Sequence, residues 1–263
     1  MKNLKLAAVC LSCLTMTGCS ALNFSVEGLI NAPKLTSEQS EIHQALIESV
    51  GSNITLKYPK NGEYRSAYVI ANIDDEPTDE AMVFYEYTSN GSEEDGLRVN
   101  ILDKDEDGKW YSVKELAGAG TDIDQVIISP MGSNNQTDVF VGYQNLTNDE
   151  KTMEIYSYTD GDFKRVALDT YSVLEPLDIN NDGYIELITI QRSTNNDTGA
   201  VTAKASMLNM KNNEITRGEN VDMCDNVTSY VSSKTGMLDS GRRAIFIDGL
   251  TADGKLQTEI IYY

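Results

Sequence analysis

The strongest constraint on the fold is a pattern of short β-type segments that recurs about every 50 residues. Each repeat holds up to four runs of β-branched or alternating apolar residues, which are separated by turns such as Asp107-Gly108 and Asp160-Gly161. The repeats cover residues 64–116, 119–168, 170–217 and 221–263, and the last one is incomplete. Because one such unit buries little apolar surface alone, we expect the units to stack into one all-β domain.

Four short strands in each unit are typical of the blades of a β-propeller. We therefore expect a partial or four-bladed β-propeller built from four-stranded antiparallel blades. The apolar segment Ile54–Tyr58, which precedes the first repeat, is the strand expected to complete the last blade. A β-sandwich or a β-solenoid is the alternative, although a sandwich would not repeat an acidic loop followed by a strand once in every unit.

The first residues indicate export. Lys2 and Lys5 form a short basic region, residues 6–14 form an apolar one, and Met16-Thr17-Gly18-Cys19 forms a small-residue cleavage site. The apolar run is too short to span a bilayer. The last four of these residues resemble the lipobox of bacterial lipoproteins, which implies that Cys19 becomes the lipidated first residue of the mature protein. We therefore expect a signal peptide at residues 1–18 and a lipid anchor on the outer face of the bacterial cell membrane; an ordinary signal peptide is the alternative.

Two short segments separate this anchor from the repeats. Residues 19–35 mix Ser, Asn and Pro with scattered apolar residues and are expected to form a tether. Residues 36–51 are expected to form a helix, because Thr36 and Gln39 make a capping box and apolar residues follow at helical spacing. His43 falls off the apolar face and is expected to be exposed. The repeat domain then covers residues 52–263.

Charge and composition exclude several classes of function. Removal of residues 1–18 takes away Lys2 and Lys5 but no acid, which leaves 19 basic residues against 41 acidic ones and a net charge of −22. This balance argues against binding to nucleic acid and against an electrostatic membrane contact. Cys224 is then left without a disulfide partner. His43 is the only histidine, which limits imidazole catalysis and zinc chemistry.

An acidic loop in the third repeat carries the most specific motif. Oxygen-bearing side chains stand at loop positions one, three, five and nine, and a residue with a free backbone carbonyl stands at position seven; in order these are Asp178, Asn180, Asp182, Glu186 and Tyr184. Calcium takes about six to eight oxygen ligands from flexible loops, and this alternation directs every second residue inward. An EF-hand would carry Glu at position twelve, where Thr189 stands. We interpret the stretch as a calcium-type loop between two strands, with a metal-free turn as the alternative.

The same position in the other repeats offers weaker loops. Aligned on Glu186, the first repeat presents four weaker metal candidates, Asn72, Asp74, Glu76 and Glu80. The second repeat presents a set that cannot ligate well, Pro130, Gly132, Asn134 and Asp138. The segment Asp103–Gly108 looks like another calcium loop, but Tyr111 stands at its ninth position, so we interpret it as a tight hairpin.

The loop from Asp178 to Ile190 and its weaker echoes resemble the FG-GAP/VCBS class of propeller repeats, found in integrin α-subunit heads and bacterial surface proteins. Behind the lipobox, the helix, the strand Ile54–Tyr58 and the segment Arg65–Tyr85 resemble surface lipoproteins of clostridial-type bacteria. The resemblance implies that five residues are calcium ligands, namely Asp178, Asn180, Asp182, Tyr184 (through its carbonyl) and Glu186. The ion would be structural and would stabilise the hairpin that faces the propeller axis.

The leading functional hypothesis is a membrane-anchored, non-catalytic and calcium-stabilised binding or scaffold module with a protein or glycan ligand. The sequence carries no Gly-x-Ser-x-Gly motif, no His-based dyad and no Gly-rich phosphate loop. One alternative is a carbohydrate-active hydrolase or lyase that uses paired carboxylates, whose separation a sequence cannot give. Another is a truncated, degenerate paralogue without an activity of its own.

Overall fold

The computed structural model describes residues 35–74, 76–88, 96–131, 137–145, 150–194, 197, 199–211, 214–224 and 227–263. The predicted signal peptide, Cys19 and nearly all of the predicted tether lie outside these residues, as do Gly132 and Asn134 of the second acidic loop. In the described part, no helix has both the length and the apolar composition needed to cross a membrane.

Apart from one helix, the regular structure of the described residues consists of β-strands. The elements are α2 (Ser37–Val50), β1 (Ile54–Leu56), β2 (Tyr68–Ala71), β3 (Glu80–Tyr87), β4 (Leu97–Lys104), β5 (Trp110–Ala117), β6 (Asp122–Ser129), β7 (Asp138–Gln144), β8 (Lys151–Thr159), β9 (Asp162–Tyr171), β10 (Val173–Leu177), β11 (Glu186–Thr194), β12 (Val201–Lys211), β13 (Glu214–Arg217), β14 (Val221–Asp222), β15 (Val227–Met237), β16 (Arg243–Thr251) and β17 (Leu256–Tyr262). The all-β prediction is therefore confirmed.

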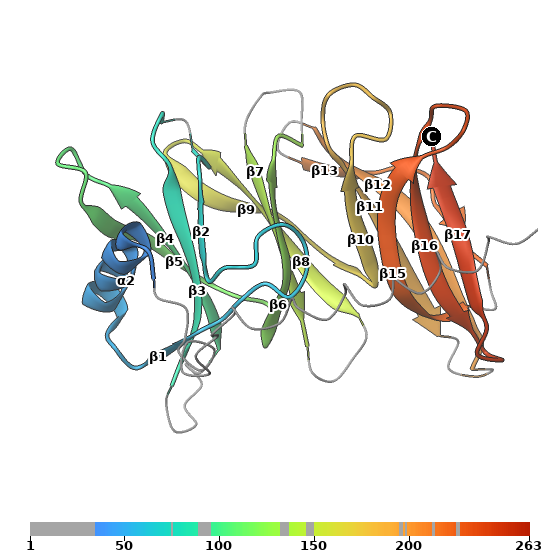
Figure 1. Ribbon diagram of the computed structural model, residues 1–263, viewed down its shortest axis with the longest axis horizontal. Helices are drawn as coiled ribbons and strands as arrows, with labels where there is room; N and C mark the ends of the chain where they lie inside the picture. The colour runs from blue at the N-terminus through green and yellow to red at the C-terminus, as the bar shows by residue number, and fades with distance from the viewer. Residues whose placement is uncertain are drawn as a thin grey trace, which may run out of the picture. The chain divides into compact units, whose positions relative to one another are not determined.

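The strands form four antiparallel sheets, and each sheet takes its strands from one stretch of the sequence. Sheet 1 contains β1 to β5, sheet 2 contains β6 to β9, sheet 3 contains β10 to β14 and sheet 4 contains β15 to β17. In sheet 2 the hydrogen-bonded order is the chain order, β6-β7-β8-β9. None of the sheets closes on itself within the described residues, and the sheets lie side by side in chain order (Figure 1).

The expected role of the segment Ile54–Tyr58 is wrong. Its strand, β1, pairs with β3 of sheet 1, with Ile54 opposite Tyr87 and Leu56 opposite Tyr85. The reason is that β2 is short and covers only the first half of β3, from Glu80 to Val83. The second half of β3 would otherwise present unpaired backbone groups at a sheet edge, and β1 pairs with them.

Apolar side chains on alternate faces of the strands hold neighbouring sheets together. Val139 and Val141 of β7 pack towards sheet 1, whereas Phe140 between them packs towards sheet 3. In the same way, Leu187 of β11 belongs to the core shared with sheet 2, and Ile188 to the core shared with sheet 4. This period-two alternation, with both faces buried, explains why these strands read as continuous apolar runs.

The chain divides into two compact units after Ser40. In the first unit the described residues include the predicted capping box: the Thr36 amide donates to Gln39 Oε1 and the Gln39 amide donates to Thr36 Oγ1, both at 3.1 Å. That prediction is confirmed.

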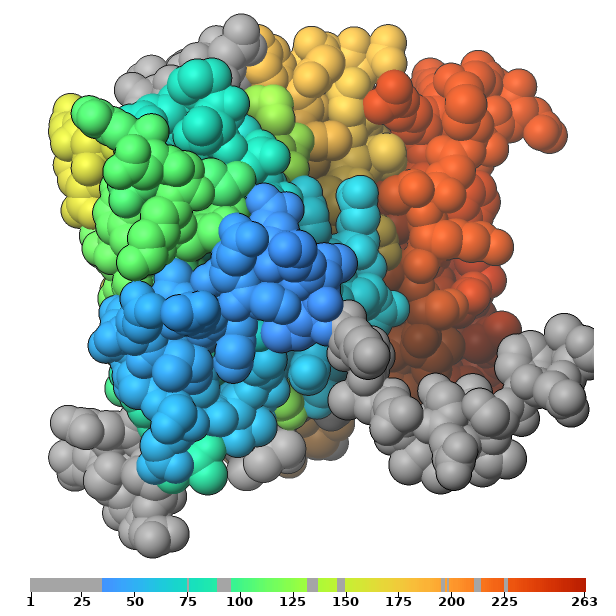
Figure 2. Space-filling model, turned by 60° about the vertical axis from the view of Figure 1, so that its left-hand side comes forward, coloured from blue at the N-terminus to red at the C-terminus, as the bar shows by residue number. Residues whose placement is uncertain are grey.

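In the second unit, residues 41–50 of α2 cover the face of sheet 1 that points away from sheet 2. Ile42 and Leu46 are buried there against Val83, and the blue helix lies on the cyan and green strands in Figure 2. The expectation that His43 is exposed is wrong, because it is half-buried and its Nδ1 lies 2.8 Å from the hydroxyl of Tyr68.

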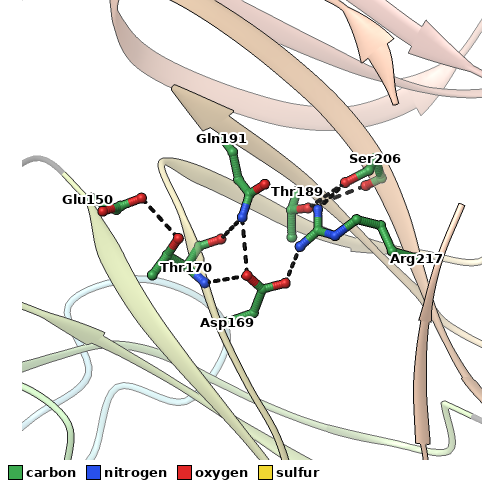
Figure 3. A network of polar contacts seen from close by, with 7 residues as sticks. All are labelled: Glu150, Asp169, Thr170, Thr189, Gln191, Ser206 and Arg217. Carbon is green, nitrogen blue, oxygen red and sulfur yellow. Dashed lines mark hydrogen bonds and ion pairs between the residues drawn. The ribbon is translucent and has the colours of Figure 1, made fainter. Parts of the chain in front are cut away.

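A polar network supplements the apolar contact between sheets 2 and 3 (Figure 3). Asp169 of β9 forms an ion pair with Arg217 of β13, and the Gln191 amide of β11 donates to Asp169 Oδ1 at 3.1 Å. Arg217 also donates to the hydroxyl of Ser206, which is buried and lies 3.3 Å from that of Thr189. The network satisfies polar groups that the packing of the two sheets removes from water.

Candidate functional site

The calcium-type loop joins β10 to β11, and the strand register closes it by pairing Leu177 with Glu186. Its backbone takes left-handed conformations at Asn181 (φ 64°) and Gly183 (φ 96°). Glycine adopts this conformation without a steric penalty, and Asn tolerates it better than most residues. Gly183 therefore lets the loop turn sharply without backbone strain.

Carboxylates at the two ends of the loop accept backbone amides within it. Asp178 accepts the amide of Asp182 at Oδ1 (3.0 Å) and that of Gly183 at Oδ2 (3.2 Å). Glu186 is only 3% exposed, and its Oε2 accepts the amide of Ile179 at 3.0 Å. Tyr184, expected to contribute its carbonyl, donates its amide to Asp182 Oδ1 at 2.9 Å. These contacts fold the loop back on its own acidic side chains.

Two nitrogen groups lie between the carboxylates of the loop. Asn180 Nδ2 donates to Glu186 Oε1 at 2.8 Å and to Asp182 Oδ2 at 3.0 Å. From sheet 4, Arg243 donates to the carbonyl of Asp178 at 2.8 Å and forms an ion pair with its carboxylate at 3.2 Å. Burial raises the pKa of Glu186, and the charges of Asp182 and Asp178 raise it further. The loop is therefore short of positive charge despite these donors.

The donor chemistry of this loop fits a hard cation. It contains three carboxylates and an amide, and a half-turn of the Asn180 side chain would direct its oxygen at the same carboxylates. These side chains do not form a complete metal-binding site, since no group of three or more His, Cys, Asp or Glu residues in the described ranges is arranged to hold a metal ion. Calcium would supply charge compensation here.

One feature of this loop recurs in three sheets. The strands β3, β7 and β11 each begin with a buried acid, and each acid accepts the backbone amide of the residue seven positions earlier; the pairs are Glu80 with Ile73 (2.8 Å), Asp138 with Met131 (3.2 Å) and Glu186 with Ile179 (3.0 Å). The residues that close the loops also correspond, because Ala71, Ser129 and Leu177 pair with these acids. The three acids that were aligned on Glu186 in the sequence therefore occupy equivalent positions in their sheets.

The first loop differs in how its acids are satisfied. The Asn72 side chain donates to the carbonyls of Glu76 (2.5 Å) and Thr78 (3.1 Å), and Asp74 accepts the amide of Glu76 at 2.7 Å. Glu80 is 3% exposed, and its Oε1 is buried without a hydrogen-bond partner among the residues that the structure describes. Burial is the largest of the influences that raise the pKa of Glu80 to about 7. Among the four weaker metal candidates, Glu80 is therefore the buried acid whose charged form is disfavoured.

The interpretation of the segment Asp103–Gly108 as a tight hairpin is consistent with its contacts. The Gly108 amide donates to the carbonyl of Asp105 at 2.8 Å, and Asp105 Oδ1 accepts the amides of Asp107 (3.0 Å) and Lys109 (2.9 Å). The segment joins β4 to β5. Its acids therefore satisfy the backbone of a turn.

The first strands of three successive sheets enclose a cleft of about 560 Å³. Its walls are formed by β6, β10 and β15, by Lys151 at the start of β8, and by residues 61–64, which connect β1 to β2. Sequence analysis did not find this cleft. The available signal was an acid within an apolar first strand, which occurs at Asp124 in β6 and at Glu175 in β10.

Asp124 organises the sheet 2 side of the cleft. It is 1% exposed. Its carboxylate contacts the ammonium of Lys151 (2.8 Å), the hydroxyl of Tyr171 (2.6 Å) and the side-chain amide of Asn61 (2.8 Å). Burial and the charge of Asp124 raise the pKa of Tyr171 far above its ordinary value, so this phenol remains a donor. The contacts give a buried carboxylate a cation and two further donors.

Glu175 lies on the other side of the cleft. It is half-buried on β10, and the hydroxyl of Ser233 on β15 donates to its Oε1. Burial raises the pKa of Glu175, and the hydrogen bond from Ser233 opposes this shift in part. The cleft thus presents carboxylates from sheets 2 and 3 to one enclosed space.

No family model matches this chain, and no curated protein matches it. Among solved structures, it is similar to a candidate exo-beta-1,3-galactanase from Bifidobacterium bifidum s17, with 14% sequence identity and a TM-score of 0.28. The match covers 78% of this chain and 71% of that one. A likeness this distant supports no statement about fold, activity or ligand.

Proposed function

We propose that this protein is a non-catalytic binding module, anchored by lipid on Cys19 to the outer face of a bacterial cell membrane. Its four sheets act as blades of a partial β-propeller of the FG-GAP/VCBS type, and its ligand occupies the cleft. The observation that carries the proposal is that the first strands of three successive sheets enclose one polar cleft. A binding site shared by several repeats requires the sheets to keep a fixed arrangement.

Calcium is proposed to maintain part of that arrangement. Asp178, Asp182 and Glu186 repel one another in the loop between β10 and β11, and a bound cation would remove this repulsion. The same loop contacts sheet 4 through Arg243, so ordering it also supports the strand pair β15 and β16 that borders the cleft. The proposed role of the ion is structural.

The experiment is thermal unfolding of the full chain in detergent, with calcium and then with a chelator. A ligand that binds only the folded state raises the free energy of unfolding by RT ln(1 + [L]/Kd), or about 2.7 kcal/mol at a hundredfold excess over Kd. We expect calcium to raise the unfolding temperature of the native chain. The substitutions Asp178→Ala and Asp182→Asn should abolish this shift.

Asp105→Ala is the matched control, because Asp105 also accepts two backbone amides in an acidic turn. It should lower stability without changing the response to calcium. Asp182→Asn keeps an oxygen for the Tyr184 amide and removes the charge, so it remains informative if Asp178→Ala does not fold. A native chain that unfolds at the same temperature with calcium and with chelator would refute the calcium proposal.

A second candidate is a carbohydrate-active hydrolase or lyase, and the carboxylates of Asp124 and Glu175 in one cleft are the observation that favours it. Its test is incubation of the native chain and Glu175→Gln with a panel of polysaccharides. Release of reducing sugar by the native chain, lost in Glu175→Gln without loss of stability, would replace the binding module by an enzyme.

A further inference from the structure

The chemistry of the cleft indicates what it binds, an inference that rests on the proposed binding function. Lys151 is the only Lys or Arg side chain among the described residues that line the cleft, whereas Glu63, Asp124 and Glu175 all line it. The ammonium of Lys151 is already paired with Asp124 at 2.8 Å. A ligand therefore meets two carboxylates, on Glu63 and Glu175, without a cation from the described chain.

Glu175 is the better placed of the two to hold a ligand. Its Oε1 accepts the hydroxyl of Ser233, which fixes the carboxylate against β15. Its side chain lines the cleft, and Ser233 is the one hydrogen-bond partner found for its carboxylate among the described residues, so Oε2 remains to accept a donor from a ligand. Partial burial removes water from this group, and burial accordingly raises its pKa. A desolvated carboxylate favours a donor that brings positive charge.

The backbone around Glu175 favours a peptide as the carrier of that charge. Among the described residues, β6, β10 and β15 each pair with one strand only, so each has an edge without a strand partner, and residues of all three strands line the cleft. On β6 the edge is already contacted by a bend of the chain, since Lys60 donates its backbone amide to the carbonyl of Ile123 (3.1 Å) and Asn61 donates its backbone amide to that of Asp124 (2.7 Å). The edge carbonyls of β6 thus accept amides from another segment of the chain, and at an edge that is unpaired an extended peptide can bind through its backbone amides and carbonyls.

We propose that the cleft binds an extended peptide segment carrying a lysine or arginine side chain, whose ammonium or guanidinium pairs with Glu175. Backbone groups of the peptide pair with the open edge of β15. The edge of β10 is less suited, because Pro176 lacks an amide hydrogen there and Gln125 already donates to the carbonyl of Leu174 at 3.3 Å. The carboxylate of Glu63 also attracts the cationic side chain of the peptide. It contributes less binding free energy than Glu175 because it is exposed to solvent.

The experiment is isothermal titration of the full chain in detergent with three capped pentapeptides, Gly-Ser-X-Ser-Gly, in which X is lysine, arginine or norleucine. Norleucine keeps the aliphatic stem and removes the charge. We expect the lysine and arginine peptides to bind at least about tenfold more tightly than the norleucine peptide, which corresponds to about 1.4 kcal/mol. Binding should weaken as salt is added, because part of the attraction is electrostatic.

Three variants locate the site. Glu175→Gln should remove most of the preference for lysine over norleucine, Glu63→Gln should reduce it slightly, and Glu106→Gln should leave it unchanged. Glu106 is the matched control, since it is an exposed acid in the hairpin between β4 and β5 and does not line the cleft. Circular dichroism of each variant separates a lost contact from a lost fold.

The outcomes separate this inference from the function on which it rests. Equal binding of the norleucine peptide, or a lysine preference that survives Glu175→Gln, would overturn the inference. So would binding of a neutral oligosaccharide in place of all three peptides, although the protein would remain a binding module. Repeating the titration with chelator tests calcium separately, because the Glu175 contact should persist while the chain stays folded.

Discussion

Replacement of Glu80 by Gln tests whether the charge of the buried acid at the start of β3 destabilises the fold. Glu80 accepts the amide of Ile73 at Oε2, but its Oε1 is buried and has no hydrogen-bond partner in the described part of the chain. Gln keeps the shape and the acceptor oxygen while removing the charge that burial disfavours. We therefore expect Glu80→Gln to stabilise the folded protein at alkaline pH and to have little effect at mildly acidic pH.

The magnitude follows from the pKa. Folding raises the pKa of Glu80 from 4.5 to about 7, and a shift of this size corresponds to at most about 3.4 kcal/mol. The proton is bound more tightly in the folded state, so the stability it contributes is present below pH 4.5 and is lost as the pH rises towards 7. Since relaxation of the loop reduces the cost of the buried charge, we expect Glu80→Gln to gain about 1–2 kcal/mol over the native chain between pH 5 and pH 8.

The assay is urea unfolding at several pH values with chelator present, followed by tryptophan fluorescence. Trp110 is the only tryptophan of the chain and is 3% exposed in the core between sheet 1 and α2, so it reports on the sheet that carries Glu80. Glu76→Gln, an exposed acid of the same loop, is the control and should show no comparable pH dependence. A difference in stability between Glu80→Gln and the native chain that is the same at pH 5 and pH 8 would refute the reasoning.

Two further substitutions test the contacts between sheets. A Cβ added at Gly142 would overlap the hydroxyl of Tyr171, so Gly142→Ala should displace it from Asp124 and cost about 1–3 kcal/mol in thermal unfolding. Gly218→Ala, whose nearest neighbour lies at an ordinary 3.4 Å, should be close to neutral, and equal losses in both variants would contradict this explanation. Arg217→Met leaves Asp169 without its cation and should cost about 1–2 kcal/mol; a double-mutant cycle with Asp169→Asn that shows no coupling would exclude a contribution from the ion pair.

The positions of the strands could be predicted from the sequence, because alternation and turn residues are local signals. The acids that end the aligned loops, Glu80, Asp138 and Glu186, stand at the starts of β3, β7 and β11. The partner of a strand is not a local property. The segment at Ile54 was recognised as a strand but assigned to the wrong sheet, because only the structure shows that β2 leaves half of β3 unpaired.

The candidate cleft escaped prediction for a related reason. Ser233 and Glu175 are 58 positions apart, and Tyr171 and Asp124 are 47 apart, yet each pair is joined by a hydrogen bond. A periodic pattern places such residues on equivalent strands, but it does not indicate which strands of different sheets lie next to one another around a cleft. The acidic loop was recognisable because its side chains contact one another within nine residues of sequence. Its calcium ion stays a prediction.

The hairpin of β15 and β16 lacks the buried acid that the hairpins β2–β3, β6–β7 and β10–β11 share. Its loop is shorter, since Met237 pairs with Arg243, and its backbone closes on itself through the amides of Leu238 and Gly241. These two amides are satisfied by carbonyls of the loop itself and not by the side chain at the start of β16. Arg243 stands at this position and reaches the neighbouring loop at Asp178 instead. Where the other three hairpins have an acid that contacts its own loop, this hairpin has an arginine that joins sheet 4 to the loop of sheet 3.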